Sequence, residues 1–190
     1  IIDDVEIDNN YKTIVTIGRL AKPQDYPTLL KSVRLVKDKM DVKVIILGKG
    51  PEKENIVELI SQLRIEDSVE LVGFKDNPYK YLRKADLFLL TSRWEGFAHV
   101  IVEAMVLGIP VIATDCKSGP KEIIGENEYG VIVPVGDVEN ISENIIHILR
   151  DENLSDKYSD LGKKRARDFD SKKIIKQYED LFLMCLNSER

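Results

Sequence analysis

VKVIILGKGPEKENIVELISQL, residues 42–63, contains one complete unit of strand, loop and helix. Residues 42–47 form a short run that is apolar except for Lys43, which predicts a strand buried on both faces. Gly48-Lys49-Gly50-Pro51 ends that run, and a helical pattern continues over residues 51–63. Proline suits the first turn of a helix because its missing amide hydrogen is not needed there. The stretch therefore predicts a buried strand followed by a covering helix.

The same unit recurs along the chain. Further apolar, β-branched runs predict buried strands at residues 13–17, 69–72, 87–90, 111–113 and 130–133. Helical patterns lie between and after them, at residues 26–39, 78–84, 98–107, 120–124 and 138–151. Strict alternation without Asn-Gly hairpin signals favours a parallel sheet covered on both faces. The expected fold is a doubly wound, Rossmann-like α/β domain.

The carboxyl-terminal segment, residues 153–190, follows a different pattern. It carries no strand signal, only two helical stretches separated near residues 169–171. The second stretch has an apolar stripe at helical spacing, formed by Ile174, Ile175, Tyr178, Leu181, Phe182 and Leu186. Two interpretations stay open: the stripe packs on this domain's own sheet, or part of it covers a partner domain that this sequence lacks.

Composition excludes several classes of protein. The 190 residues are 43% hydrophobic and 32% charged, which suits one globular domain with a sizeable core. The net charge of -5 and the scattered Lys and Arg residues argue against a nucleic-acid binder. No apolar run reaches the length of a membrane span, and IIDDVEIDNN lacks the pattern of a signal peptide.

The cysteines and histidines give no sign of a metal site. Cys116 and Cys185 have neither metal-type nor disulfide-framework spacing, which fits a reducing compartment, with the cytoplasm as the expected location. His99 and His147 are isolated from each other, so we expect no bound metal.

Ligands of open parallel sheets bind beyond the carboxyl ends of the strands, so the loops that follow the strands matter most. Gly18-Arg19-Leu20 follows the first strand, where a dinucleotide-binding protein would have G-x-G-x-x-G. The planar guanidinium of Arg19 suits phosphate oxygens. The alternative is a surface arginine paired with an acid.

Two further loops offer ligand contacts. Gly48 and Gly50 permit close approach of a ligand to the backbone ahead of a helix, although they could also form a plain tight turn. Phe74 and Lys75 follow a strand that ends near Gly73, and either side chain could meet a nucleobase. The alternative for Phe74 is a place in the core.

SRWEGFAHVIVEAM, residues 92–105, holds two glutamates of interest. We expect Gly96 to bend the loop so that the next amides, at a helix amino terminus, face a phosphate. Glu103 follows in a helix that is otherwise apolar from Val100 to Leu107, and its carboxylate could accept two ribose hydroxyls. The alternative places Glu103 on a solvent-facing side of the helix, but its apolar neighbours leave little exposed face. Glu95 would reach another part of the ligand.

These motifs together resemble family 4 of the retaining glycosyltransferases. The glutamate pair in S-x-x-E-G-F-x-x-x-x-x-E-A resembles the family signature. The loops at residues 18–20, 48–51 and 72–74 and the segments at residues 108–113 and 119–123 also match it in order, so the resemblance covers about residues 13–149. It implies a GT-B fold with two facing Rossmann-like halves, of which this chain resembles the second, donor-binding half.

The resemblance implies three segments. Residues 1–12 would be a remnant of the interdomain linker, and residues 13–152 would form the nucleotide-sugar-binding domain. Residues 153–190 would be helices that pack on this domain and toward the amino-terminal, acceptor-binding half.

The resemblance also assigns roles to residues. Arg19 and Glu95 would be the catalytic pair, with Arg19 on the donor diphosphate and Glu95 on the transferred sugar. The amides of Gly96, Phe97 and Ala98 would also bind the diphosphate, Glu103 the ribose, and Phe74 with Lys75 the base. Family members usually carry a lysine where this chain has Gln24, and Lys22 is a candidate replacement on the diphosphate. His99 is a further candidate contact for sugar or phosphate.

The implied activity is transfer of a sugar from a nucleoside diphosphate sugar, with retention at the anomeric carbon, to a glycan or lipid-linked acceptor. We expect a UDP-sugar rather than a GDP-sugar, no cofactor, and a cytoplasmic enzyme that associates peripherally with the inner face of the plasma membrane. The alternatives are a GT-B nucleotide-sugar epimerase and an inactive nucleotide-binding or regulatory domain. The glutamate pair together with Gly18-Arg19-Leu20 favours transfer.

Overall fold

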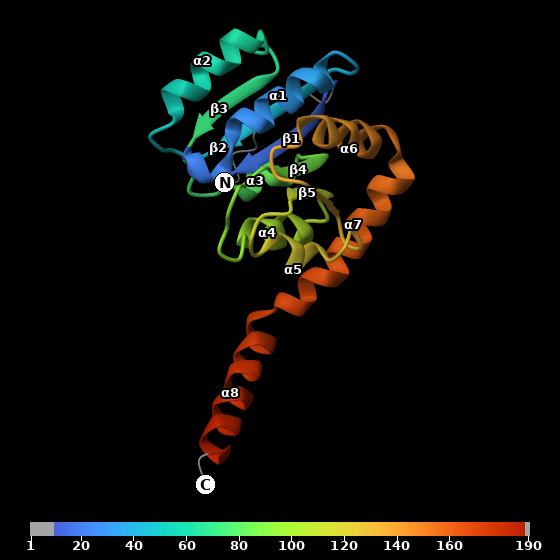
Figure 1. The fold of residues 1–190 in the computed structure, drawn as a ribbon. Coiled ribbons are helices and arrows are strands. Elements are labelled where there is room, and N and C mark those ends of the chain that lie inside the picture. The colour runs from blue at the N-terminus through green and yellow to red at the C-terminus, as the bar shows by residue number, and fades with distance from the viewer. Residues whose placement is uncertain (1–9, 189–190) are drawn as a thin grey trace.

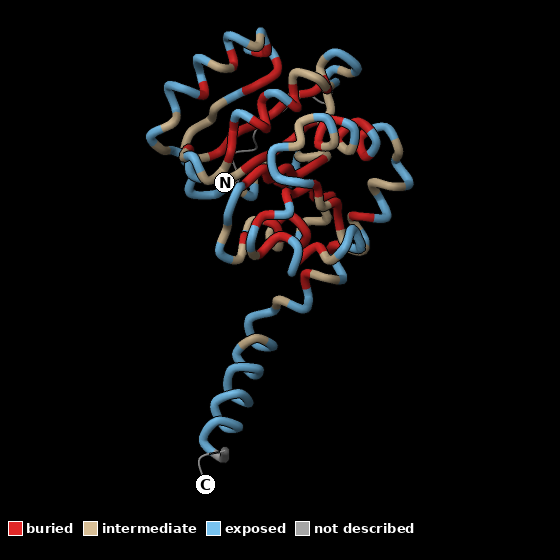
Figure 2. The backbone as a smooth tube through the Cα atoms, in the orientation of Figure 1, coloured by how far each residue is buried: buried red, intermediate tan, exposed pale blue. Residues whose placement is uncertain are grey.

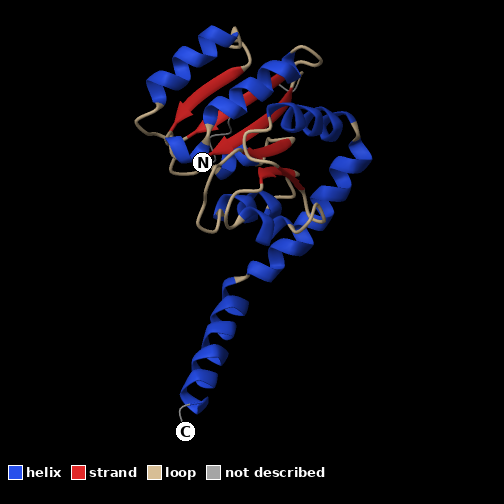
Figure 3. Cartoon of the chain, in the orientation of Figure 1, coloured by secondary structure: helices blue, strands red, loops and turns tan. Residues whose placement is uncertain are grey.

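The computed structural model describes residues 10–188 and contains one parallel sheet of six strands in the order β3-β2-β1-β4-β5-β6. Every described strand pairing is parallel. The strands are β1 (Lys12–Ile17), β2 (Val42–Leu47), β3 (Val69–Gly73), β4 (Leu87–Leu90), β5 (Val111–Thr114) and β6 (Val131–Val133). The predicted doubly wound fold is therefore confirmed (Figure 3).

Helices cover both faces of the sheet (Figure 1). One face carries α1 (Tyr26–Lys37), α2 (Lys53–Leu63) and α6 (Val138–Arg150). The other carries α3 (Tyr79–Leu82), α4 (His99–Val106) and α5 (Pro120–Ile124), and α7 (Glu152–Ala166) packs on α4. This arrangement buries both surfaces of the strands, as a parallel sheet requires.

The core divides into two clusters because successive strand side chains point to opposite faces. Ile14 of β1 and Ile46 of β2 join the cluster under α1, α2 and α6. Their neighbours Val15 and Ile45, with Phe88 of β4, join the cluster under α3, α4 and α5. Phe88 is fully buried, so a polar side chain at this position would disrupt the centre of the sheet.

Some predicted boundaries were wrong. Helix α2 begins at Lys53 rather than Pro51, because the amide of Glu52 donates to the carbonyl of Leu20, 2.9 Å away, and keeps these residues in a turn. A short 3-10 helix, Lys22–Gln24, precedes α1 and was not predicted from the sequence. The other predicted ends differ from the observed ends by no more than a few residues, as is usual for predicted boundaries.

Helix α8 (Ser171–Ser188) projects away from the sheet after the short helical turn Arg167–Phe169 (Figures 1 and 2). Its apolar side chains after the half-buried Ile174 are exposed; Tyr178 is 58% and Phe182 62% accessible. The interpretation that the stripe packs on the domain's own sheet is therefore wrong, and the alternative of a partner domain stays a prediction. Most of the predicted linker, residues 1–12, lies outside the described residues.

Candidate functional site

Three loops meet at the carboxyl edge of the sheet, where β1 lies between β2 and β4 and the strand order reverses. The amide of Leu20 donates to the carbonyl of Lys49, 3.1 Å away, and joins the loops after β1 and β2. The amide of Arg93 donates to the carbonyl of Pro23, 2.7 Å away, and joins the loops after β4 and β1. This crevice is the usual ligand position in doubly wound sheets, and it collects the predicted motifs.

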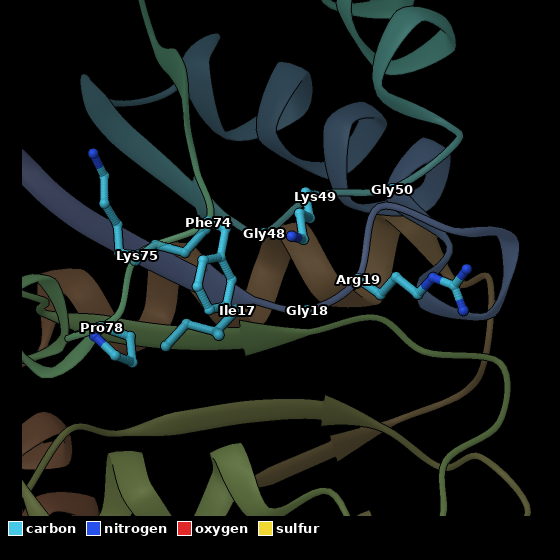
Figure 4. Close-up of a pocket in the computed structure, with 10 residues that line it drawn as sticks. Ile17, Gly18, Arg19, Gly48, Lys49, Gly50, Phe74, Lys75 and Pro78 are labelled. Atoms are coloured by element: carbon cyan, nitrogen blue, oxygen red, sulfur yellow. The ribbon is translucent and has the colours of Figure 1, made fainter.

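A cavity of about 640 Å³, a size typical of small-molecule sites, opens between the loops that follow β1, β2 and β3. Its lining includes five residues predicted from the sequence: Arg19, Gly48, Gly50, Phe74 and Lys75. Figure 4 shows the Phe74 ring beside Ile17, with Arg19 toward the other end of the cavity. The cavity therefore offers an aromatic surface at one end and a cation at the other.

The aromatic end is exposed. Phe74 is 62% accessible, so the alternative that it belongs to the core is wrong. The ammonium of Lys49 lies 5.2 Å from the centre of the Phe74 ring, within the range of a cation–π contact. A planar ligand could stack on this ring without opening the core.

The cationic end belongs to Arg19. Within residues 10–188 no carboxylate forms an ion pair with its exposed guanidinium, so the alternative of a structural ion pair is wrong. Gln24 packs against the same loop: a Cβ added to Gly18 would lie 3.1 Å from Cγ of Gln24. Lys22 lines a different cavity, so the structure does not bring it to the cavity of Arg19.

Gly48 and Gly50 are required by the chain's own backbone. A Cβ added to Gly48, whose φ is +148°, would lie 1.8 Å from the carbonyl oxygen of Gly18, and one on Gly50 would lie 2.3 Å from that of Leu20. The close approach that the glycines permit is therefore between two loops, which fixes the walls of the cavity.

Glu95 lies close to the loop that carries Arg19. The hydroxyl of Ser92 donates to its carboxylate at 2.6 Å, and the hydroxyl of Ser118 donates to its backbone carbonyl at 2.6 Å. Burial raises the pKa of the Tyr26 hydroxyl, and the charge of Glu95 raises it further. Tyr26 also donates to the carbonyl of Gly18 at 3.2 Å, so it connects Glu95 with the loop that carries Arg19.

The loop bends at Gly96 and Phe97, and the backbone turns again just before α4. Ala98, not Gly96, has the left-handed conformation, with φ 57°, immediately before α4. Gly96 is exposed, and a Cβ added there would meet nothing within 4 Å. No side chain caps α4, and its first turn holds no acidic residue. The amides at this helix start are thus open to an anion, with free space beside Gly96.

Glu103 is half-buried on α4 and faces Tyr79 of α3. The charge of Glu103 is the main cause that raises the pKa of the Tyr79 hydroxyl; burial and a hydrogen bond to the carboxylate also contribute. Pro78, the residue before Tyr79, lines the cavity of Arg19 and Phe74. The helix exposes more apolar surface than predicted, since Val106 is 60% accessible. Tyr79 was missed because nothing in the sequence places it opposite Glu103.

His99 and the Phe97 side chain lie on another surface. Their rings are 5.0 Å apart, and Phe97 also meets Phe169 at 5.4 Å. Both line an open cavity of about 800 Å³ together with Tyr178 and Leu181 of α8. The structure therefore does not bring the His99 side chain into the cavity of Arg19.

Between residues 10 and 188 no cluster of three or more His, Cys, Asp or Glu side chains could hold a metal ion. No helix in that range is both long and apolar enough to cross a membrane.

Comparison with known proteins gives consistent matches. The family model for glycosyl transferases group 1 matches residues 1–165. The N-acetylgalactosamine-N,N'-diacetylbacillosaminyl-diphospho-undecaprenol 4-alpha-N-acetylgalactosaminyltransferase of Campylobacter jejuni is 34% identical over 92% of this chain and 47% of its own length. The N-acetyl-alpha-D-glucosaminyl L-malate synthase of Bacillus anthracis is 32% identical over 97% of this chain and 48% of its own length. The chain thus spans about half the length of these curated relatives.

Solved structures match the same fold. A TarM variant of S. aureus, in complex with fondaparinux, alpha-GlcNAc-glycerol and UDP, has a TM-score of 0.85 at 26% identity. The match covers 95% of this chain and 38% of that one. HepE of Anabaena, in complex with UDP and glucose, has a TM-score of 0.84 at 23% identity over 91% of this chain and 48% of that one, which shows the fold alone.

Proposed function

We propose, from the premise that this chain belongs to the glycosyl transferases group 1, that it is the donor-binding half of a retaining glycosyltransferase. The observation that carries the proposal is the cavity with Arg19, which pairs with no carboxylate of residues 10–188, at one end and the exposed Phe74 at the other. Its donor would be a nucleoside diphosphate sugar. The epimerase and the inactive regulatory domain find no support in the comparisons above.

Different residues would bind different parts of the donor. The base would lie on Phe74 near Lys75, the ribose on Glu103, and the diphosphate between Arg19, Gln24 and the amides of residues 96–98. Lys22, which lines a separate cavity, is not part of this arrangement. Arg19 and the uncapped amides of α4 would stabilise the departing diphosphate, an electrostatic contribution that is often the largest in catalysis. Glu95, held by Ser92, would orient the hydroxyls of the transferred sugar.

The finer identity of the substrates is part of the proposal. The UDP bound by the TarM structure supports a UDP-sugar over a GDP-sugar. The lipid diphosphate in the name of the Campylobacter jejuni relative supports a lipid-linked acceptor and peripheral association with the cytoplasmic face of the plasma membrane. Calorimetric titration with UDP-, GDP- and ADP-sugars separates the donors, since only the matching base would bind tightly.

The acceptor-binding half would pack against α8. The exposed stripe of α8 and the 800 Å³ cavity beside it form an exposed apolar surface, which is typical of a protein–protein contact. We expect an amino-terminal half, expressed separately, to co-purify with this chain, and Leu181→Glu with Phe182→Glu to abolish this. Lys176→Glu, on the polar side of α8, is the matched control. Unchanged co-purification by the double variant would contradict this packing.

The Glu103→Gln variant tests the ribose assignment. We expect nucleotide affinity to fall about tenfold, because the amide replaces one acceptor oxygen with a donor and removes the charge. The free energy of unfolding should change by less than about 1 kcal/mol, since the side chain is only half-buried. Calorimetry and chemical denaturation measure the two effects, with Glu58→Gln on the exposed side of α2 as control. Equal nucleotide affinity in both variants would remove Glu103 from the site.

A further inference from the structure

A second cavity, of about 390 Å³, lies on the other side of the loop that carries Arg19. It is bounded by the start of α1, the start of α2 and Arg93-Trp94 of the loop after β4. None of its lining residues lines the cavity of Arg19 and Phe74. The hydrogen bonds of Leu20 to Lys49 and Glu52 hold the dividing loop in place between the two cavities. The nucleotide assignments therefore leave this cavity without a role.

An exposed indole forms part of its lining. Trp94 is 55% accessible, although a tryptophan side chain normally finds an apolar partner. The backbone beside it is fixed: the amide of Arg93 donates to the carbonyl of Pro23, and its guanidinium contacts the buried carboxylate of Asp25 at 2.9 Å. The loop thus places an exposed aromatic side chain at the cavity on a backbone that these contacts hold.

The rest of the lining joins a largely apolar wall, which includes Tyr26, Ile56 and Leu59, to polar groups whose charges balance. Lys22 and Arg93 supply two positive charges, and Asp25 and Glu52 supply two negative ones. The Asn55 amide donates to the carboxylate of Glu52 at 2.9 Å, which leaves the amide oxygen of Asn55 and further lone pairs of Glu52 for a ligand. A balanced lining does not select an anion. An aromatic face with nearby carboxylate and amide groups suits a neutral ring with many hydroxyls.

The cavity lies next to the carboxylate assigned to the transferred sugar. Glu95 directly follows Trp94 in the chain. Tyr26 lines this cavity, while its hydroxyl donates to the carbonyl of Gly18, which lines the other one. The charge of Glu95 also acts on Tyr26. Tyr26 and Glu95 therefore stand where the two cavities approach each other.

We propose that this cavity is a saccharide subsite that holds a neutral sugar ring of the acceptor, stacked on Trp94 and hydrogen-bonded to Glu52 and Asn55. This inference rests on the proposed function for its link to the acceptor. It adds an acceptor contact to the half of the enzyme that binds the donor, and it places that ring next to the transferred sugar at Glu95.

The chain contains a single tryptophan, so its fluorescence reports on this cavity alone. We expect a neutral methyl glycoside of glucose, galactose, N-acetylglucosamine or N-acetylgalactosamine to change the emission saturably, with or without saturating UDP. Asn55→Ala should weaken this binding about tenfold, and Val57→Ala, exposed on the same helix, should not. Saturation-transfer NMR on the glycoside should lose its signal in Trp94→Ala and recover part of it in Trp94→Phe.

The same variants show whether the sugar in this cavity belongs to the acceptor or to the donor. In the full-length enzyme we expect Trp94→Ala to raise the KM for the acceptor and leave the affinities for UDP and UDP-sugar unchanged. A selective loss of UDP-sugar affinity would instead place the donor's sugar in the cavity and overturn the proposal. Absence of saturation transfer from all four glycosides, in a chain that binds UDP, would also overturn it. A chain that binds glycoside but not UDP would contradict the proposed function and keep the saccharide site.

Discussion

Replacing Gly48 with alanine is expected to lower the free energy of unfolding by about 2 to 6 kcal/mol, a large part of the stability of a domain of this size. The new Cβ would lie 1.8 Å from the carbonyl oxygen of Gly18, a backbone atom that cannot rotate away. The φ of +148° adds strain of its own. Chemical denaturation measures the loss, and nucleotide affinity should fall with it because the cavity wall moves.

Two other glycines separate the steric clash from the backbone strain in the expected effect of Gly48→Ala. Gly136 has φ +81° and open space where a Cβ would stand, so Gly136→Ala reports backbone strain without a clash. Gly96 has open space without that conformation, so Gly96→Ala should change stability by less than about 1 kcal/mol. If Gly48→Ala costs no more than Gly136→Ala, the close contact between the loops after β1 and β2 is not a determinant of the fold.

Replacing Arg19 with alanine is expected to weaken nucleotide binding about ten- to a hundredfold. Loss of a hydrogen bond to a charged group costs about 1.5 to 3 kcal/mol, and each 1.4 kcal/mol changes affinity tenfold. The exposed guanidinium forms no ion pair within the described residues, so its removal should leave the free energy of unfolding almost unchanged. Calorimetric titration with UDP and with uridine measures whether the loss depends on the diphosphate.

Arg34→Ala is the matched control for that experiment. Arg34 pairs with Asp38 on the surface of α1 and lines neither the cavity of Arg19 nor that of Trp94. Arg19→Lys should recover part of the UDP affinity, because it keeps the charge and loses the two-pronged geometry of the guanidinium. UDP affinity that is unchanged in Arg19→Ala would remove the diphosphate from this end of the cavity.

The strands and the fold class could be predicted because strands buried on both faces consist almost entirely of apolar residues. Residues 42–47 and 87–90 are predicted to the residue, since runs such as Leu87-Phe88-Leu89-Leu90 suit little except the centre of a parallel sheet. The carboxyl-edge loops followed from topology, since parallel strands bring their ends together. The topology therefore predicts that Arg19 and Phe74 lie in one region, and both line the same cavity.

Other features depend on contacts that the sequence does not encode locally. Gly48 and Gly50 look like ligand-approach glycines, yet their close neighbours are the carbonyls of Gly18 and Leu20, some thirty residues earlier in the chain. The left-handed residue immediately before α4 is Ala98, whose buried side chain belongs to the core cluster under α3, α4 and α5, rather than Gly96 two residues earlier. The pairing of Glu103 with Tyr79 also requires the tertiary arrangement of α3 and α4.

The direction in which α8 projects could not be predicted from the sequence either. A stripe such as Ile174, Tyr178 and Leu181 has the same helical spacing whether it packs on its own domain or on another one. Only the position of the preceding turn, Arg167–Phe169, decides which surface the stripe meets, and that turn directs α8 away from the sheet.

Calorimetric titration of UDP into the 190-residue chain tests the central claim most directly. The donor-binding half of a glycosyltransferase should bind UDP at one site, with affinity that falls in Arg19→Ala and in Glu103→Gln and stays constant in Arg34→Ala and Glu58→Gln. Absence of binding of UDP, GDP and ADP by a chain that circular dichroism shows to be folded would contradict the claim.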